Sequence, residues 1–203
     1  MRRRLLLTCS ALIAAAGISL LGNQAYLRAK GLLAGLLIDR ACAAYMQDGL
    51  PHRPWSWADM HLVARLEVPR LGVRRTVLSG ATGSTLAFGL GHLEETAIPG
   101  QPGNCVLAGH RDTCGAFLED LRVGDEVRLR GPQGTWSYRV KSTMIVTKEE
   151  TRLLEPTDEP RLTLVTCYPF SGLLRSRWRY AVICAPDLAL HGPFQPAARA
   201  ASN

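Results

Sequence analysis

Three short segments carry side chains that suit acyl transfer, and each adjoins a run of strand-forming residues. They are residues 108–110 (AGH), 162–167 (LTLVTC) and 175–180 (RSRWRY). A cysteine attacks a carbonyl as the thiolate, a form that cationic neighbours favour. Acyl transfer also needs an acid for the leaving amine and a donor for the developing oxyanion. His110 suits the acid, Cys167 the nucleophile, and an arginine the donor.

Each segment taken alone also has a structural explanation. Cys167 could be a small core residue at a strand end, and a single histidine after a strand is usually structural. Arg175, Arg177 and Arg179 alternate, which places them on one strand face, and a solvated basic edge would explain them. Two antiparallel strands joined by a loop of about ten residues, however, can place Cys167 beside Arg179.

The segments lie in a part of the chain that reads as short strands separated by turns. From His61 onward, apolar and polar residues alternate and Gly/Pro pairs interrupt them. The predicted strands are 62–68, 76–78, 104–109, 124–129, 135–146, 162–167 and 179–184, with a helical turn at 117–121, a helical or irregular stretch at 85–90 and a hairpin connection at 131–134. About eight short strands with one or two short helices predict an all-β barrel or sandwich.

The N-terminus predicts a membrane anchor. Residues 2–4 are arginines, and residues 5–22 are eighteen residues without a charge, a length marginal for a bilayer core of about 30 Å at about 1.5 Å per residue. No clear small-x-small cleavage site ends this run before Asn23, so an uncleaved anchor is favoured over a signal peptide. By the positive-inside rule the arginines stay cytoplasmic and the rest of the chain lies across the membrane.

The chain therefore divides into five predicted regions. They are a cytoplasmic N-terminus (1–4), a transmembrane anchor (5–22), a membrane-proximal helix and linker (23–60, helical to Asp48), a catalytic β domain (61–186) and a loose Ala/Pro-rich tail (187–203).

Charge and cysteine spacing exclude several functional classes. The net charge is +7, but three of the positive charges are the N-terminal arginines and no later basic block with interleaved aromatics appears, which disfavours nucleic-acid binding. No C-x-x-C occurs, and the six cysteines form no paired framework, although one disulfide would be compatible with them. Glu149, Glu150, Asp158 and Glu159 read as a solvated loop. We therefore predict no cofactor and no obligatory metal.

Local motifs and their order narrow the families of thiol enzymes. Papain-like enzymes place cysteine before histidine, the caspase motif Q-A-C-x-G is missing, and so is the H-G-C signature of L,D-transpeptidases. Strand-Ala-Gly-His, then Thr-Leu-x-Thr-Cys, then an arginine opening a final strand resembles the sortases, which are membrane-anchored cysteine transpeptidases. The resemblance covers roughly residues 62–186. Residues 106–113 (VLAGHRDT), the Tyr-Pro-Phe after Cys167 and the short anchor resemble the proteobacterial subgroup, which lies on the periplasmic face of the inner membrane.

The resemblance implies a closed eight-stranded barrel and a role for each matching residue. Cys167 would attack the Thr–Gly-type bond of an LPxTG-like C-terminal sorting signal on a protein substrate and form a thioester. His110 would protonate the leaving amine and later deprotonate the amine acceptor, whose identity the sequence does not give. Arg179 matches the arginine of the family, with Arg177 as the second choice and Arg175 expected at the surface.

Two alternatives and one departure from the subgroup pattern remain open. The same His110–Cys167 pair would suit a peptidoglycan transpeptidase or a cysteine peptidase. A non-catalytic, membrane-tethered barrel would make Cys167 structural. Cys114 stands where the subgroup usually carries a further histidine, either as a harmless substitution or as a redox-sensitive neighbour of His110.

Overall fold

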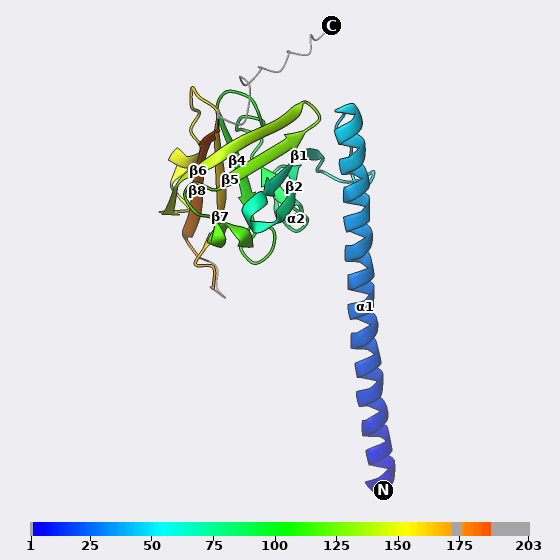
Figure 1. The fold of residues 1–203 in the computed structure, drawn as a ribbon. Helices are drawn as coiled ribbons and strands as arrows, with labels where there is room; N and C mark the ends of the chain where they lie inside the picture. Colours follow the sequence, from blue (N-terminus) through cyan, green and yellow to red (C-terminus); the bar gives the residue numbers. More distant parts are fainter. Residues whose placement is uncertain (1, 172–175, 188–203) are drawn as a thin grey trace. The chain divides into compact units, whose positions relative to one another are not determined.

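The computed structural model describes residues 2–171 and 176–187 of the 203-residue chain (Figure 1). Apart from Asp187, the predicted loose tail lies outside the described residues. In chain order the elements are α1 (Arg2–Asp48), β1 (Leu62–Val68), η1 (Pro69–Leu71), β2 (Val73–Ser79), α2 (Gly83–Leu86), β3 (Leu90–His92), β4 (Asn104–Gly109), η2 (Ala116–Asp120), β5 (Glu126–Gly131), β6 (Gly134–Thr147), η3 (Thr151–Leu154), β7 (Arg161–Tyr168) and β8 (Trp178–Pro186).

Helix α1 is continuous over 47 residues, which confirms the helix predicted up to Asp48. By length and composition it is a candidate membrane span. Residues 1–40 form one unit, and the chain from Ala41 onward forms the second. The helix ends at Asp48. The next residue, Gly49, adopts φ +72° and donates its N–H to the carbonyl of Tyr45 over 2.9 Å. A glycine in this left-handed conformation is a common C-terminal cap of helices.

The second unit is a closed eight-stranded barrel, which confirms the predicted all-β fold. The strand order around the barrel is β1-β2-β3-β4-β7-β8-β6-β5. The β2–β3 and β4–β7 pairs are parallel, and the other neighbouring pairs are antiparallel. Each strand of the closed barrel therefore has a neighbouring strand on both sides, although β3 pairs with only the last three residues of β2.

The barrel interior is filled by the apolar side chains that alternate along the strands. In β1 every second residue is buried, from Leu62 to Val68. The other strands contribute Val77, Leu90, Cys105, Leu107, Val127, Leu129, Tyr138, Val140, Leu162, Leu164, Val182 and Cys184. This two-residue period assigns the intervening residues of each strand to the outer face.

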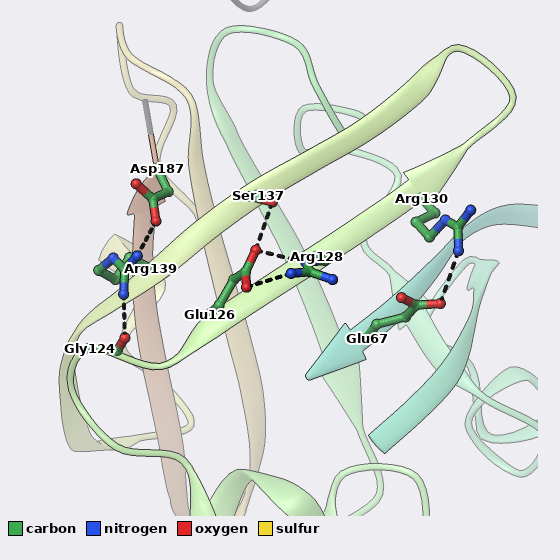
Figure 2. Close-up of polar contacts among 8 residues, drawn as sticks. All are labelled: Glu67, Gly124, Glu126, Arg128, Arg130, Ser137, Arg139 and Asp187. Carbon is green, nitrogen blue, oxygen red and sulfur yellow. Dashed lines mark hydrogen bonds and ion pairs between the residues drawn. The ribbon is translucent and has the colours of Figure 1, made fainter. Parts of the chain in front are cut away.

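The outer face of β1, β5 and β6 carries paired charges (Figure 2). Glu126 accepts hydrogen bonds from Nε and Nη2 of Arg128 at 2.7 and 2.8 Å and from the Ser137 hydroxyl at 3.1 Å. The Arg128 guanidinium therefore holds the pKa of Glu126 below its usual value. The other contacts drawn there join Arg130 to Glu67, and Arg139 to Asp187 and the Gly124 carbonyl. Such partly exposed pairs suit a solvated surface and contribute little stability.

Besides the short 3-10 helix η1, two elements of the barrel were not predicted from the sequence. Strand β3 has only three residues, too few for an alternating pattern, and Gly91 lies so close to its neighbours that a Cβ there would be 2.4 Å from the Gly80 carbonyl oxygen. The 3-10 helix η3 follows a polar stretch and starts where the Glu150 carboxylate accepts from the backbone N–H of Arg152. Both depend on contacts between distant or irregular segments.

Candidate active site

The three predicted catalytic residues lie on or directly after three neighbouring strands of the barrel, β4, β7 and β8. Cys167 in β7 pairs directly with Arg179 in β8, which confirms that the two strands place these residues side by side. His110 follows β4, whose last residue, Gly109, pairs with Thr166. His110 and Cys167 are the residues that directly follow this last pair, and we call His110, Cys167 and Arg179 the catalytic row.

All three residues of this row lie outside the packed interior of the barrel. Leu162 and Leu164 of β7 and Val182 of β8 are in the core. Cys167 and Arg179 each lie an odd number of residues from them along their strands and therefore belong to the outer face. In β4, Cys105 and Leu107 point inward, and His110, which directly follows the strand, is solvent-exposed. A substrate can therefore reach the row without opening the barrel.

Exposure separates Cys167 from the other barrel cysteines. Cys167 is partly buried, whereas Cys105 and Cys184 are 2% and 0% exposed, and all six cysteines of the chain are free thiols. Burial in the apolar core raises the pKa of both Cys105 and Cys184. Because the thiolate is the nucleophilic form, the accessible Cys167 is the suitable nucleophile among these three.

The turn after β4 holds His110 in a compact loop. The His110 carbonyl accepts from the backbone N–H of Thr113 at 3.1 Å and of Gly115 at 2.8 Å. Gly109 and Gly115 approach so closely that a Cβ on Gly109 would lie 2.9 Å from the Gly115 Cα. His110 itself is solvent-exposed. The backbone at this point is therefore fixed while the imidazole remains accessible.

Thr166 joins the strand that leads to His110 to the strand that carries Cys167. Its hydroxyl donates to the Gly109 carbonyl oxygen over 2.8 Å, and both residues are buried. No separate role for this threonine was predicted from the sequence. Its partner becomes visible only when the parallel pairing of β4 with β7 is known.

Arg179 and Arg177 occupy different environments, although their alternation predicted a shared strand face. Arg179 lies within β8 and donates from Nη1 to the carbonyls of Ser176 and Trp178 at 3.0 and 2.9 Å. Arg177 precedes the first residue of β8, is exposed, and stacks over the Trp178 ring with 5.2 Å between Cζ and the ring centroid. Arg175 lies outside the described residues.

Cys114 is built into the turn that carries His110. Its Sγ accepts from the His110 backbone N–H at 3.2 Å and lies 3.5 Å from the Leu86 carbonyl oxygen, to which it donates. The side chain is 9% exposed and belongs to the main core cluster. These contacts give Cys114 a structural role in the turn.

Among residues 2–171 and 176–187, no three His, Cys, Asp or Glu side chains are grouped as metal ligands would be. In the acidic loop before β7, the Glu150 carboxylate accepts from Arg152, and this bond lowers the pKa of Glu150. At the opposite end of the barrel from His110, a cavity is lined by His61, His92 and Trp136, among other residues. It is separate from the catalytic row.

Comparison with known proteins gives a consistent family. A family model described as the sortase domain matches residues 66–187. The chain is 34% identical over 118 residues to sortase D of Bacillus subtilis (strain 168), covering 58% of this chain and 60% of that protein. It is 29% identical over 110 residues to sortase A of Listeria monocytogenes, covering 52% and 49%. The chain thus spans 60% and 49% of the length of these two curated relatives.

Solved structures show the same barrel. A sortase D5 transpeptidase of Clostridium perfringens superposes with a TM-score of 0.55 at 29% identity, covering 62% of this chain and 79% of that chain. Sortase A from Corynebacterium diphtheriae gives a TM-score of 0.58 at 27% identity, covering 64% and 63%.

Proposed function

Because the chain belongs to the sortase family, whose domain it matches over residues 66–187, we propose that it is a cysteine transpeptidase acting on C-terminal sorting signals. The substrate is a protein with an LPxTG-like signal, cut at the Thr–Gly-type bond. The observation that carries the proposal is that Cys167 and Arg179 are strand partners and that His110 directly follows the residue paired with Thr166 on the neighbouring strand. No metal or cofactor is needed for this chemistry.

The first step forms a thioester. The Cys167 thiolate attacks the threonine carbonyl carbon, and the carbonyl oxygen becomes an oxyanion. Arg179, paired with Cys167 across β7 and β8, donates to this oxyanion. As the C–N bond breaks, protonated His110 gives its proton to the departing glycine amine. The products are the acyl-enzyme and the released C-terminal segment.

The second step reverses the roles of acid and base. An amine attacks the thioester carbonyl, His110 accepts the proton that the amine loses, and Cys167 leaves as the thiolate. Water in place of the amine gives hydrolysis. Because His110 is exposed at the edge of the row, the acceptor can approach from solvent while the acyl chain lies along the outer face of the barrel.

We also propose where the enzyme works. The apolar part of α1 serves as a single-pass anchor, and Arg2, Arg3 and Arg4 stay on the cytoplasmic side. The catalytic domain then lies across the membrane. The VLAGHRDT motif and the Tyr-Pro-Phe after Cys167 support assignment to the proteobacterial subgroup, at the periplasmic face of the inner membrane.

The test uses the full chain in detergent micelles with a panel of sorting-signal peptides. Intact-mass spectrometry should show a Cys167 adduct equal to the acyl part of the peptide, and an added amine should release it as a ligated product. The Cys167→Ala variant should form no adduct. Turnover of muropeptides without any response to the peptides would replace the proposal with a peptidoglycan enzyme. Absence of turnover of both the peptides and the muropeptides would favour the non-catalytic, membrane-tethered barrel.

A further inference from the structure

Arg111, the residue after His110, is a buried cation in a loop. It is 8% exposed. Its Nη1 donates to the Pro169 carbonyl oxygen at 2.8 Å, and its Nε lies 3.5 Å from the carboxylate of Asp112, which is 60% exposed. Removing a guanidinium from water carries a penalty of several kcal/mol that only well-formed contacts offset. A buried arginine at this position therefore indicates a role that a neutral side chain would not fill.

The contact of Arg111 joins the turn that carries His110 to the loop that follows β7, the strand that carries Cys167. Arg111 directly follows His110, and Pro169 is the second residue after Cys167. The last ordered link between β4 and β7 is the bond from Thr166 to Gly109. β4 ends at Gly109 and β7 ends two residues after Thr166, at Tyr168, and the bond from Arg111 to Pro169 connects the segments that follow the two strands.

We propose that Arg111 is a positioning residue that fixes the turn bearing His110 against the loop that follows Cys167. The inference rests on the proposed acyl transfer, in which His110 must reach the amine that leaves from the carbon bonded to Cys167. Arg111 contacts a backbone carbonyl and acts through the two loops, unlike Arg179, which is paired with Cys167 itself. It therefore sets the geometry of proton transfer.

This role separates two reactions of the same thiol. Alkylation of Cys167 by iodoacetamide needs only an accessible thiolate. Acylation by a peptide also needs His110 at the correct distance from the leaving amine. Loss of the Arg111 contact should impair acylation and leave alkylation nearly unchanged. A displacement of about 1 Å in a catalytic group costs about 100-fold in rate.

The experiment compares Arg111→Gln and Arg111→Lys with wild type and with Arg130→Gln. Arg130 is an exposed arginine on β5 that contacts Glu67, so its variant controls for loss of a charge. The readouts are hydrogen–deuterium exchange in peptides covering residues 109–115 and 167–171, the rate of iodoacetamide alkylation, and kcat and KM for a sorting peptide.

We expect Arg111→Gln to speed exchange in both peptides, to lower kcat by about 100-fold with little change in KM, and to keep the alkylation rate within about twofold. Arg111→Lys retains one donor and should recover part of kcat. Unchanged exchange, or alkylation falling in parallel with acylation, would overturn the inference. A wild-type chain that never acylates contradicts the proposed function, whereas the exchange measurement still decides whether Arg111 joins the two loops.

Discussion

The hydroxyl of Thr166 donates a hydrogen bond to the carbonyl oxygen of Gly109 across the parallel pair β4–β7. Each of these residues directly precedes a residue of the catalytic row, Cys167 in one strand and His110 in the other. The bond therefore sets the spacing of the proposed nucleophile and the proposed acid at the last point where the strands are paired.

Replacing Thr166 by valine keeps the shape of the side chain and removes this bond. The Gly109 carbonyl is then left without its side-chain donor, and we expect a loss of about 1–3 kcal/mol in the free energy of unfolding. The rate of peptide acylation should fall by more than the loss of folded protein would explain. Urea unfolding and stopped-time adduct formation measure the two effects. Ser137→Ala, which removes a buried hydroxyl on β6, is the matched control and should retain acylation.

Replacing Arg179 and replacing Arg177 should have very different effects on kcat. Arg179→Ala removes the donor proposed for the oxyanion, so kcat for the sorting peptide should fall by about 100- to 1,000-fold. Arg177→Ala removes an exposed contact with Trp178, worth about 0.5–1 kcal/mol to the loop, and should leave kcat nearly unchanged. A larger defect for Arg177 would reassign the donor to the second-choice arginine.

Cys167 should be the first barrel thiol to react with iodoacetamide near neutral pH. Cys105 and Cys184 are buried in the core, and burial raises the pKa of both thiols. Peptide mapping after limited alkylation locates the label. Equal labelling of Cys105 and Cys167 in the folded chain would show that exposure does not distinguish the nucleophile.

A methyl group at Gly109 or Gly115 should disturb the turn that carries His110. On Gly109 it would lie 2.7 Å from Leu90 Cδ2 and 2.9 Å from the Gly115 Cα, and on Gly115 it would lie 3.0 Å from the Thr166 hydroxyl. Overpacking of this kind costs about 1–3 kcal/mol. Gly109→Ala and Gly115→Ala should lower both the melting temperature and acylation. Gly83→Ala in α2 meets nothing within 4 Å and is the control.

Asp125 should stabilise the barrel in a pH-dependent way. It accepts from Arg70 Nε at 2.5 Å and from the Arg122 backbone N–H at 2.7 Å, and the Arg70 guanidinium lowers the pKa of this carboxyl from its ordinary value of 3.8. A carboxyl with a lowered folded-state pKa contributes stability above 3.8, and that contribution is lost as the pH falls below it.

The Asp125→Asn variant should therefore be less stable than wild type at neutral pH, by about 1–2 kcal/mol. The two unfolding free energies should converge as the pH falls below the ordinary value of 3.8. Urea unfolding across this pH range measures the difference. A constant difference in unfolding free energy at all pH values would show that the charge of the Asp125 carboxylate is not what stabilises the barrel here.

Much of the fold follows from local patterns in the sequence. The alternation in Leu62–Val68 and in Arg161–Tyr168 predicts strands because inward positions must be apolar in a barrel. The three-residue β3 has no such pattern, and its place depends on pairing with residues far along the chain. Parallel pairing of β4 with β7 is likewise a long-range property, so the bond between Thr166 and Gly109 could not be read from either segment.

The candidate site was likewise only partly predictable from the sequence. The residue types at positions 110 and 167 were sufficient to propose an acid and a nucleophile. Alternation grouped Arg177 with Arg179 but could not say where β8 begins, and the strand starts between them at Trp178. The role of Arg111 was missed because a cation after a histidine gives no signal of burial, which depends on how two loops pack.

The catalytic row lies on the outer face of a wall whose inner face is the tightly packed core. Substitutions at the exposed positions of this outer face therefore leave the packing of the core unchanged. We expect substitutions at partly exposed outer positions such as Val165 and Ile183 to change this surface without opening a cavity in the core, whereas Val106, Thr163 and Ala181 on the same faces are buried. The same separation makes the partly exposed positions the natural choice for a directed-evolution library.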